Sequence, residues 1–222
     1  MLLCELKNVT KTYSVGEEVT PVKDLYFKIY SGDFVAIKGE SGIGKSTLLF
    51  LIGGLLKATE GEIVYRNQAI SKLTDSQCSL WRRNKIGYLF QDSQLIQALT
   101  VKENILMAGR FGTGGKIKDK EADKILEKLG VDDKKNSMPY QLSGGQRRRV
   151  MIAAVLAKKP ELILADEPTN DLDERWSDRI MELLMDETKN GGAVVLVTHD
   201  EKSASYAEKI YCLEDGKLNL QQ

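Results

Sequence analysis

The sequence predicts an α/β fold with a mostly parallel central sheet, a small antiparallel sheet beside it and an inserted helical segment. Continuous apolar runs, as over 162–165 and 193–197, are typical of parallel strands that are buried on both faces. Alternating runs near the N-terminus, as over 2–9 and 26–29, indicate strands of an antiparallel sheet. From about residue 92 to residue 159 the apolar residues recur instead at helical spacing.

Composition places the chain among ordinary globular proteins with one large domain. It has 222 residues, of which 42% are hydrophobic and 29% are charged. Lys and Arg together number 32, as do Asp and Glu, so there is no net basic field and we expect no nucleic-acid partner. A local basic patch, for example at Arg147, Arg148 and Arg149, remains open.

The cysteines and the hydropathy pattern indicate a cytoplasmic chain without direct membrane insertion. Cys4, Cys78 and Cys212 are odd in number and lack metal-ligand spacing, so we expect free thiols in a reducing compartment. No stretch of the sequence approaches the roughly 20 apolar residues that span a bilayer. We therefore expect any role at a membrane to come through a partner.

The strongest motif is a glycine-rich loop that fits the phosphate-binding pattern G-x-x-x-x-G-K-[ST] without a mismatch. A β-prone apolar run precedes the loop and the buried face of a helix follows it, which is the context that the motif requires. This context disfavours the alternative, a glycine-rich turn that merely begins a helix. The residues of the loop are Gly39, Glu40, Ser41, Gly42, Ile43, Gly44, Lys45, Ser46 and Thr47.

The residue types in this loop predict how it would hold a nucleoside triphosphate. Its glycines let successive backbone N–H groups point inward as an anion nest, and the following helix adds the positive end of its dipole. Lys45 would reach the β- and γ-phosphates, Ser46 would ligate Mg²⁺, and Thr47 would bond the α-phosphate. We expect the chain to bind a nucleoside triphosphate with Mg²⁺.

One aromatic residue upstream is a candidate for contact with the base. Tyr13 lies in the segment 11–16, which we expect to be a loop between two strands of the antiparallel sheet. Its ring would face an adenine, or it would pack as an ordinary aromatic at the edge of a loop. Composition alone leaves both interpretations open.

Polar side chains follow three expected core strands, at the edge where open α/β sheets bind their ligands. They are Gln91 after the strand over 86–90, Asp166 and Glu167 after 162–165, and His199 after 193–197. Adjacent carboxylates suit Mg²⁺ and water chemistry, and a histidine beside a phosphate site would contact the γ-phosphate. The alternatives are a polar strand cap and a structural histidine.

The helical segment contains a second helix start with exposed backbone donors. Ser143 is a natural N-cap for a helix over 147–158, and Gly144 and Gly145 leave backbone N–H groups uncovered. For a generic Ser-Gly-Gly, a capped helix with no ligand would be the better interpretation. The remaining elements that we expect are a glycine-rich connection over 109–115, helices over 118–128 and 174–189, and a closing hairpin over 210–218.

Taken in order, these motifs resemble the ATP-binding-cassette (ABC) ATPase subunits over the whole chain. The specific element is Leu-Ser-Gly-Gly-Gln over 142–146, the signature motif, which other phosphate-loop proteins lack. In this resemblance the loop over 39–47 is the Walker A motif and 162–167 is the Walker B motif. The run over 83–91 looks like the bacterial subgroup that serves lipoprotein release, macrolide export and cell division.

The resemblance implies an α/β fold with a RecA-like P-loop NTPase core, an antiparallel β subdomain and an inserted α-helical subdomain, the ABC ATPase fold. The core with its β subdomain would comprise 1–91 and 160–222, and the helical subdomain about 92–159. Two cassettes would close head to tail over two ATP molecules. Three places depart from the family pattern, namely Glu40 where the subgroup often has Pro, Asn170-Asp171 in place of a small pair and Ala154 in place of a common Arg.

The resemblance also assigns roles to the motif residues. Glu167 would be the general base or the carboxylate that orients water, and His199 and Lys45 would contact the γ-phosphate. Mg²⁺ would be bound by Ser46, with Gln91 and Asp166 also bearing on it. The ATP of the partner subunit would be contacted by the signature run of Ser143, Gly144, Gly145 and Gln146.

The function implied is an ATPase that dimerises around ATP and drives a separate transmembrane permease. The resemblance favours export, of a lipoprotein, peptide or drug, over import. Because every motif is intact, the resemblance favours a homodimer, held peripherally on the inner face of the membrane by the permease. An ATP-dependent regulator that controls a partner through a membrane protein without transport stays open. A soluble relative that acts on DNA or ribosomes is disfavoured, because the chain carries no coiled-coil insertion, second cassette or basic extension.

Overall fold

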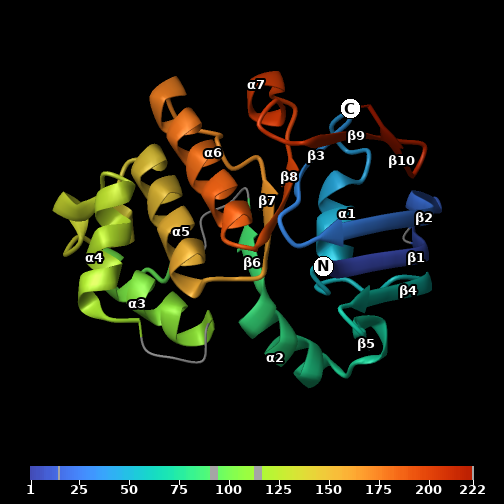
Figure 1. Cartoon of the computed structure of the whole chain (residues 1–222), viewed down its shortest axis with the longest axis horizontal. Helices are drawn as coiled ribbons and strands as arrows, with labels where there is room; N and C mark the ends of the chain where they lie inside the picture. The colour runs from blue at the N-terminus through green and yellow to red at the C-terminus, as the bar shows by residue number, and fades with distance from the viewer. Residues whose placement is uncertain (15, 91–94, 113–116, 222) are drawn as a thin grey trace.

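The computed structural model describes residues 1–14, 16–90, 95–112 and 117–221. Its N-terminal strands form an antiparallel sheet in the order β2-β1-β4-β5 (Figure 1). The strands of this sheet are β1 (Leu2–Tyr13), β2 (Val19–Tyr30), β4 (Glu60–Tyr65) and β5 (Gln68–Ala69). The expected antiparallel sheet is therefore confirmed.

Strand β1 is longer than the sequence predicts. The expected loop over 11–16 was wrong in its first part, because Lys11 pairs with Val22 and Tyr13 pairs with Val19 of β2. These ladder partners come from the next strand, so the local sequence around Tyr13 does not reveal them. Tyr13 thus lies on the last residue of a strand, which fixes its backbone more firmly than a loop would.

The second sheet is the centre of the molecule, with strand order β10-β9-β3-β8-β7-β6. Its strands are β3 (Phe34–Lys38), β6 (Ile86–Leu89), β7 (Leu162–Asp166), β8 (Ala193–Val197), β9 (Lys209–Glu214) and β10 (Lys217–Leu220). All neighbouring pairs are parallel except β9 and β10, which form the expected closing hairpin. The carboxyl ends of the parallel strands therefore meet at one edge, where ligands bind in such sheets.

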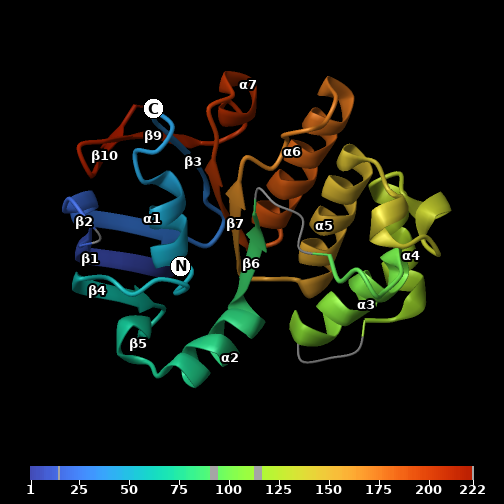
Figure 2. The same cartoon turned by 180° about the vertical axis from the view of Figure 1, so that it is seen from behind.

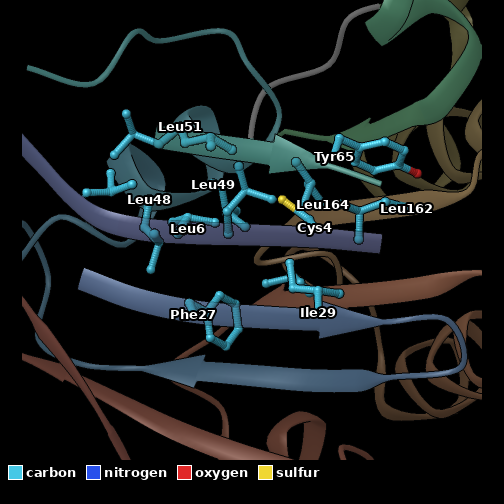
Figure 3. Packing of buried hydrophobic residues seen from close by; sticks show 14 of the residues in the cluster. Cys4, Leu6, Phe27, Ile29, Leu48, Leu49, Leu51, Tyr65, Leu162 and Leu164 are labelled. Carbon is cyan, nitrogen blue, oxygen red and sulfur yellow. The ribbon is translucent and has the colours of Figure 1, made fainter. Parts of the chain in front are cut away.

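The central sheet divides the buried side chains into two clusters, because successive residues of a strand face opposite sides. Val195 and Leu164 face the antiparallel sheet, while Val194 and Ile163 face the helices on the other side. Figure 3 shows the first cluster, where Leu162 and Leu164 of β7 lie against Cys4 of β1. The two sheets and the intervening helix α1 (Lys45–Ile52) therefore share one apolar core.

The other helices surround this core, and most lie on the face away from the antiparallel sheet (Figures 1 and 2). They are α2 (Asp75–Lys85), α3 (Val101–Gly112), α4 (Asp119–Lys128), α5 (Gly144–Lys158), α6 (Glu174–Lys189) and α7 (Glu201–Ala204), with short 3₁₀ turns η1 (Ile70–Lys72), η2 (Asp132–Lys134) and η3 (Pro139–Gln141). Helices α3, α4 and α5 pack together at the end of the molecule opposite the antiparallel sheet. Within the residues that the structure describes, no helix has the length and apolar character needed to cross a membrane.

Two helical features differ from the sequence prediction. Helix α2 was not predicted, since Cys78 and Trp81 are its only buried residues and the rest of the helix is polar apart from the exposed Leu80. Helix α3 continues to Gly112, into the stretch that we expected to be a connection. A Cβ at Gly112 would lie 2.0 Å from the carbonyl oxygen of Lys158, so the glycine lets α3 approach the end of α5 closely.

Candidate functional site

The glycine-rich loop joins the end of β3 to the start of α1 in a conformation that favours glycine. Gly42 and Gly44 have φ angles of 80° and 117°, in the left-handed region. At Gly44, a Cβ would also lie 2.5 Å from the Cβ of Pro21. The Lys45 ammonium folds back over the loop and donates to the carbonyl oxygens of Gly39 and Glu40, each at 2.8 Å. The loop is therefore curled around the Lys45 ammonium.

Ser46 and Asp166 bring a hydroxyl and a carboxylate together across the sheet edge. Ser46 lies in the first turn of α1, Asp166 ends β7, and Ser46 Oγ donates to Asp166 Oδ2 at 2.7 Å. Oxygen ligands of this kind are what Mg²⁺ prefers, and it usually keeps several waters and binds only one or two protein oxygens. The pair therefore fits a Mg²⁺ ion that is completed by phosphate oxygens and water.

The Glu167 carboxylate is held by the strand that follows it in the chain. Thr198 Oγ1 donates to Glu167 Oε2 at 3.1 Å, and the His199 backbone N–H donates to Oε1 at 3.1 Å. The ring nitrogen Nδ1 of His199 lies 2.6 Å from the same Oε1. The Glu167 side chain is 13% exposed and that of His199 is 73% exposed, so the carboxylate is shielded and the imidazole is accessible.

These groups line one pocket of about 380 Å³. Its walls are the phosphate loop, the end of β7 and the segment after β8. The lining residues are Ser41, Gly42, Gly44, Lys45, Ser46, Thr47, Asp166, Glu167, Asn170 and His199. Asn170 is a lining residue that we singled out only as a departure from the family pattern, because its turn after Glu167 gave no signal of contact with the site.

Four other residues that the sequence predicted for the site, Tyr13, Glu40, Ile43 and Gln91, are not among the lining residues of this pocket. The Tyr13 hydroxyl is 3.4 Å from Thr47 Oγ1, and the Lys11 ammonium lies 5.1 Å from the centre of the Tyr13 ring. Ile43 packs against the apolar core, and Glu40 contributes its carbonyl oxygen to Lys45. Gln91 falls outside the described residues.

The signature motif forms the start of α5, with Ser143 as the N-cap that we expected, but the helix begins at Gly144 and not at 147. Ser143 Oγ accepts from the backbone N–H of Gln146 at 3.2 Å, and the Gln146 side chain accepts from the Ser143 N–H at 2.9 Å. This reciprocal capping box fixes the helix start while Ser143 and Gly144 stay exposed. The backbone N–H groups of the first helical turn have no partner within the helix. None of the signature residues lines the pocket of the phosphate loop.

The three consecutive arginines do not form the basic patch that the sequence left open. Arg147 donates to the carbonyl oxygen of Leu142 at 2.5 Å, and Arg149 donates to that of Leu129 at 2.8 Å. Arg148 is 4% exposed, and its guanidinium donates to backbone carbonyls at the carboxyl ends of β6 and β7. Sequence reasoning missed this placement, because a run of arginines is usually a solvated surface.

Comparison with known proteins agrees with this geometry. The ABC transporter family matches residues 22–170 of the chain. The chain is 42% identical over 227 aligned residues to the ABC transporter ATP-binding protein MJ0796 of Methanocaldococcus jannaschii, and the alignment covers 99% of this chain and 97% of that protein. A dimeric structure of MJ0796 in a post-hydrolysis state, bound to ADP and Pi, superposes with a TM-score of 0.93 at 40% identity and covers 99% of this chain and 98% of that one.

Other relatives differ in length from this chain. The macrolide export ATP-binding/permease protein MacB of Wolinella succinogenes is 38% identical over 222 residues, covering 99% of this chain and 34% of MacB. The chain thus spans about a third of the length of the MacB relatives that it matches. The putative hemin import ATP-binding protein HrtA of Staphylococcus epidermidis is 36% identical over 216 residues, covering 96% of this chain and 97% of HrtA. The chain belongs to the ABC transporter family, as an ATP-binding subunit with ATPase activity.

Proposed function

We propose that two copies of this chain enclose two ATP molecules and that the enclosed ATP is hydrolysed to drive a separate membrane permease. The proposal rests on the finding that one chain has two places suited to bind phosphate, the pocket of the phosphate loop and the start of α5, and that these two places do not form one site. The pocket unites Lys45, Ser46, Asp166, Glu167 and His199, whereas the exposed start of α5 is not part of it. A second copy, turned head to tail, would bring its α5 start over this pocket.

The residues of the pocket would divide the work of phosphoryl transfer between positioning and charge stabilisation. Backbone N–H groups of the loop, together with Lys45, would hold the phosphates, and Ser46 and Asp166 would hold Mg²⁺. By the family resemblance, Gln91 would also bear on this ion. When bound, Mg²⁺ would neutralise charge on the phosphate oxygens. Tyr13 would present its ring to the adenine base, since it lies at the end of β1 beside Thr47.

Glu167 would orient the attacking water and accept its proton. The carboxylate is suited to this task because Thr198 and the His199 backbone N–H fix both of its oxygens. His199, whose imidazole is exposed on the pocket side of Glu167, would contact the γ-phosphate. Across the dimer, Ser143 and the Gly145 backbone would add donors to the same phosphate, beside Gly144 and Gln146.

A permease partner is supported by the relatives and by one exposed surface. The name of MacB describes it as both an ATP-binding protein and a permease, and this chain aligns with about a third of the length of MacB. Three large apolar side chains are exposed to solvent here, namely Leu80 of α2, Phe111 of α3 and Ile96 in the segment before α3. We propose that the helical region over 92–159, together with α2, receives the permease, which would hold the chain at the inner face of the membrane. The core over 1–91 and 160–222 would then carry the nucleotide.

The direction of transport that we propose is export, which the name of MacB supports. The name of HrtA points to import instead. Accumulation of a substrate inside inverted vesicles that contain the permease and this chain would support export. Loss of preloaded substrate from the same vesicles would contradict it.

The hydrolytic role of Glu167 is tested by the substitution E167Q, which keeps the size of the side chain and removes its charge. We expect ATP turnover to fall by about 10²-fold or more, because the base that positions the water is lost. The matched control is E127Q on the exposed side of α4, which removes the same charge far from the pocket. Turnover by E167Q equal to that of E127Q would rule out this role for Glu167.

A further inference from the structure

The buried guanidinium of Arg148 joins helix α5 to the backbone at the ends of strands β6 and β7, where the proposed site of ATP hydrolysis lies. Its Nε donates to the carbonyl oxygen of Pro168 at 2.9 Å, and its Nη2 donates to that of Asp166 at 3.0 Å. Further bonds run from Nη1 to the carbonyl oxygen of Phe90 and from Nη2 to that of Glu167. These acceptors lie at the carboxyl end of β7 and directly after β6 and β7. One side chain of α5 thus holds the backbone around both catalytic strand ends.

The neighbouring arginines show that this arrangement is not a general property of α5. Arg147 donates to the carbonyl oxygen of Leu142, next to its own helix start. Arg149 donates to the turn after α4, and its guanidinium lies 4.1 Å from the centre of the Trp176 ring. In the contacts described for the three residues, only those of Arg148 reach the ends of β6 and β7.

The backbone at Glu167 has a conformation that needs such support. Its φ angle is 47°, in the left-handed region that residues other than glycine seldom adopt. The Glu167 N–H donates to the carbonyl oxygen of Val197 at 2.9 Å, and its own carbonyl oxygen accepts from Arg148. The peptide groups on both sides are therefore fixed, and with them the direction in which the Glu167 carboxylate leaves the chain.

Arg148 and the signature motif belong to one helix. Arg148 lies on the second turn of α5, which begins directly after the N-cap residue Ser143. Burial lowers the pKa of the guanidinium, and the charges of Asp171, Asp166 and Glu167 oppose this effect. Because arginine stays charged at neutral pH, the contacts to the carbonyls are charge-assisted hydrogen bonds. These bonds would therefore pass a displacement of the helix start to the strand ends.

We propose that Arg148 is a positioning residue for ATP hydrolysis, which keeps the backbone of Asp166, Glu167 and Pro168 in register with the helix that begins at the signature motif. The inference rests on the proposed dimeric ATPase. The signature motif would contact the ATP of the partner subunit, and Glu167 would act on the ATP of its own subunit. Arg148 would thereby make hydrolysis in one site depend on closure over the other.

The first test compares R148Q and R148K with R149M in the full chain. We expect R148Q to bind a fluorescent ATP analogue with an affinity within about twofold of wild type, while kcat falls by about tenfold or more. R148K should recover part of the loss, since it keeps the charge but not the fork of donors. R149M removes a partly buried guanidinium of the same helix away from the strand ends, and its kcat should stay within about threefold of wild type.

A double-mutant cycle with E167Q separates positioning from loss of structure. If Arg148 acts through Glu167, adding R148Q to E167Q should change the residual single-turnover rate by less than about twofold. A further loss of about tenfold in the double variant, or an unchanged kcat in R148Q, would overturn the inference. If R148Q does not fold, the same cycle with R148K decides the question.

Failure of the proposed function has a different signature. A wild-type chain that neither dimerises with ATP nor hydrolyses it would overturn the proposed dimeric ATPase, and this inference with it. An active wild type with an additive R148Q effect would overturn the role of Arg148 alone.

Discussion

Ser46 is the side chain whose proposed role separates Mg²⁺ binding from phosphate binding. Its hydroxyl faces Asp166, while the phosphates would be held mainly by Lys45 and the backbone of the loop. In S46A we expect the affinity for ATP in the presence of Mg²⁺ to fall by about tenfold or more, because one metal ligand is lost. The affinity for ATP in the presence of EDTA should stay unchanged.

The measurement is titration of a fluorescent ATP analogue with Mg²⁺ and with EDTA. The control is S79A on the exposed side of α2, which removes the same hydroxyl without touching the pocket. An equal loss of affinity under both conditions would mean that Ser46 supports the loop itself and not the metal.

How far single residues can be predicted depends on what determines their place. Lys45, Ser46, Glu167 and His199 were predicted because each sits in a short motif or at the end of a recognisable strand, and the structure places all four in one pocket. Arg148 was not predicted, since its burial is decided by the approach of β6 and β7, far away in sequence. Their roles in hydrolysis remain predictions until the variants are measured.

At the scale of elements, the start of α5 combines a structural cap with a proposed contact to ATP. Ser143 caps α5 and Thr74 caps α2 through the same reciprocal box, with Gln146 and Gln77 respectively. S143A and T74A should each lower the free energy of unfolding by about 1 kcal/mol, a loss typical of an N-cap. For a chain of this length, that is a shift of about 2–4 °C in Tm.

Only S143A should also reduce ATP turnover, since the start of α2 has no proposed role at the phosphates. Differential scanning fluorimetry and a steady-state ATPase assay on both variants make the comparison. Equal turnover by S143A and T74A, with matching losses in Tm, would contradict a contact between Ser143 and ATP.

The end of α5 carries a partly buried charge that should make stability depend on pH. Burial lowers the pKa of Lys158 from 10.5 to about 8, and its ammonium donates to the carbonyl oxygen of Ile86 at 2.5 Å. Between these two pKa values the unfolded chain binds more protons than the folded chain, so this group makes the folded state more stable as the pH rises. Below about pH 8 the cost of burying the charge is fully present.

We therefore expect K158M to change the pH dependence of unfolding by urea. The free energy of unfolding of wild type, measured relative to K158M, should rise between about pH 8 and pH 10. K124M, on the exposed side of α4, serves as the control and should leave the pH dependence of wild type unchanged. If the difference in the free energy of unfolding between wild type and K158M stays constant over this range, the pKa of Lys158 is not lowered by folding.

The elements differ in how much of them could be predicted. The bounds of α6 agree with the sequence prediction at both ends, because the helix has an Asp173 cap and a clear apolar stripe that includes Ile180 and Leu184. Helix α2 was missed because it buries so little, and α3 was cut short because glycines ordinarily end helices. In α3 the close contact of Gly109 and Gly112 with neighbouring segments outweighs their low helix propensity.

At the scale of the whole molecule, the gathering of motifs at one sheet edge follows from parallel strands. The sequence predicted the strands that end at Asp166 and before His199, and their parallel pairing through β8 brings the motifs together. The length of β1 and the reach of Arg148 depend on pairings between distant segments, which local patterns do not encode. The need for a second copy is likewise not encoded in local patterns; in the structure, the exposed start of α5 is the feature that suggests it.

The dimer is therefore the central claim, and the most direct test is the molar mass of E167Q in solution by light scattering after size exclusion. With ATP and Mg²⁺ we expect the mass of two chains, and with ADP or without nucleotide the mass of one, since trapped ATP links the phosphate loop to the partner's α5. Adding G145E to E167Q should abolish the dimer, because a carboxylate at the start of α5 would face the phosphates of the partner. An E167Q protein that binds ATP yet keeps the mass of one chain, at concentrations well above its Kd for ATP, would contradict the account.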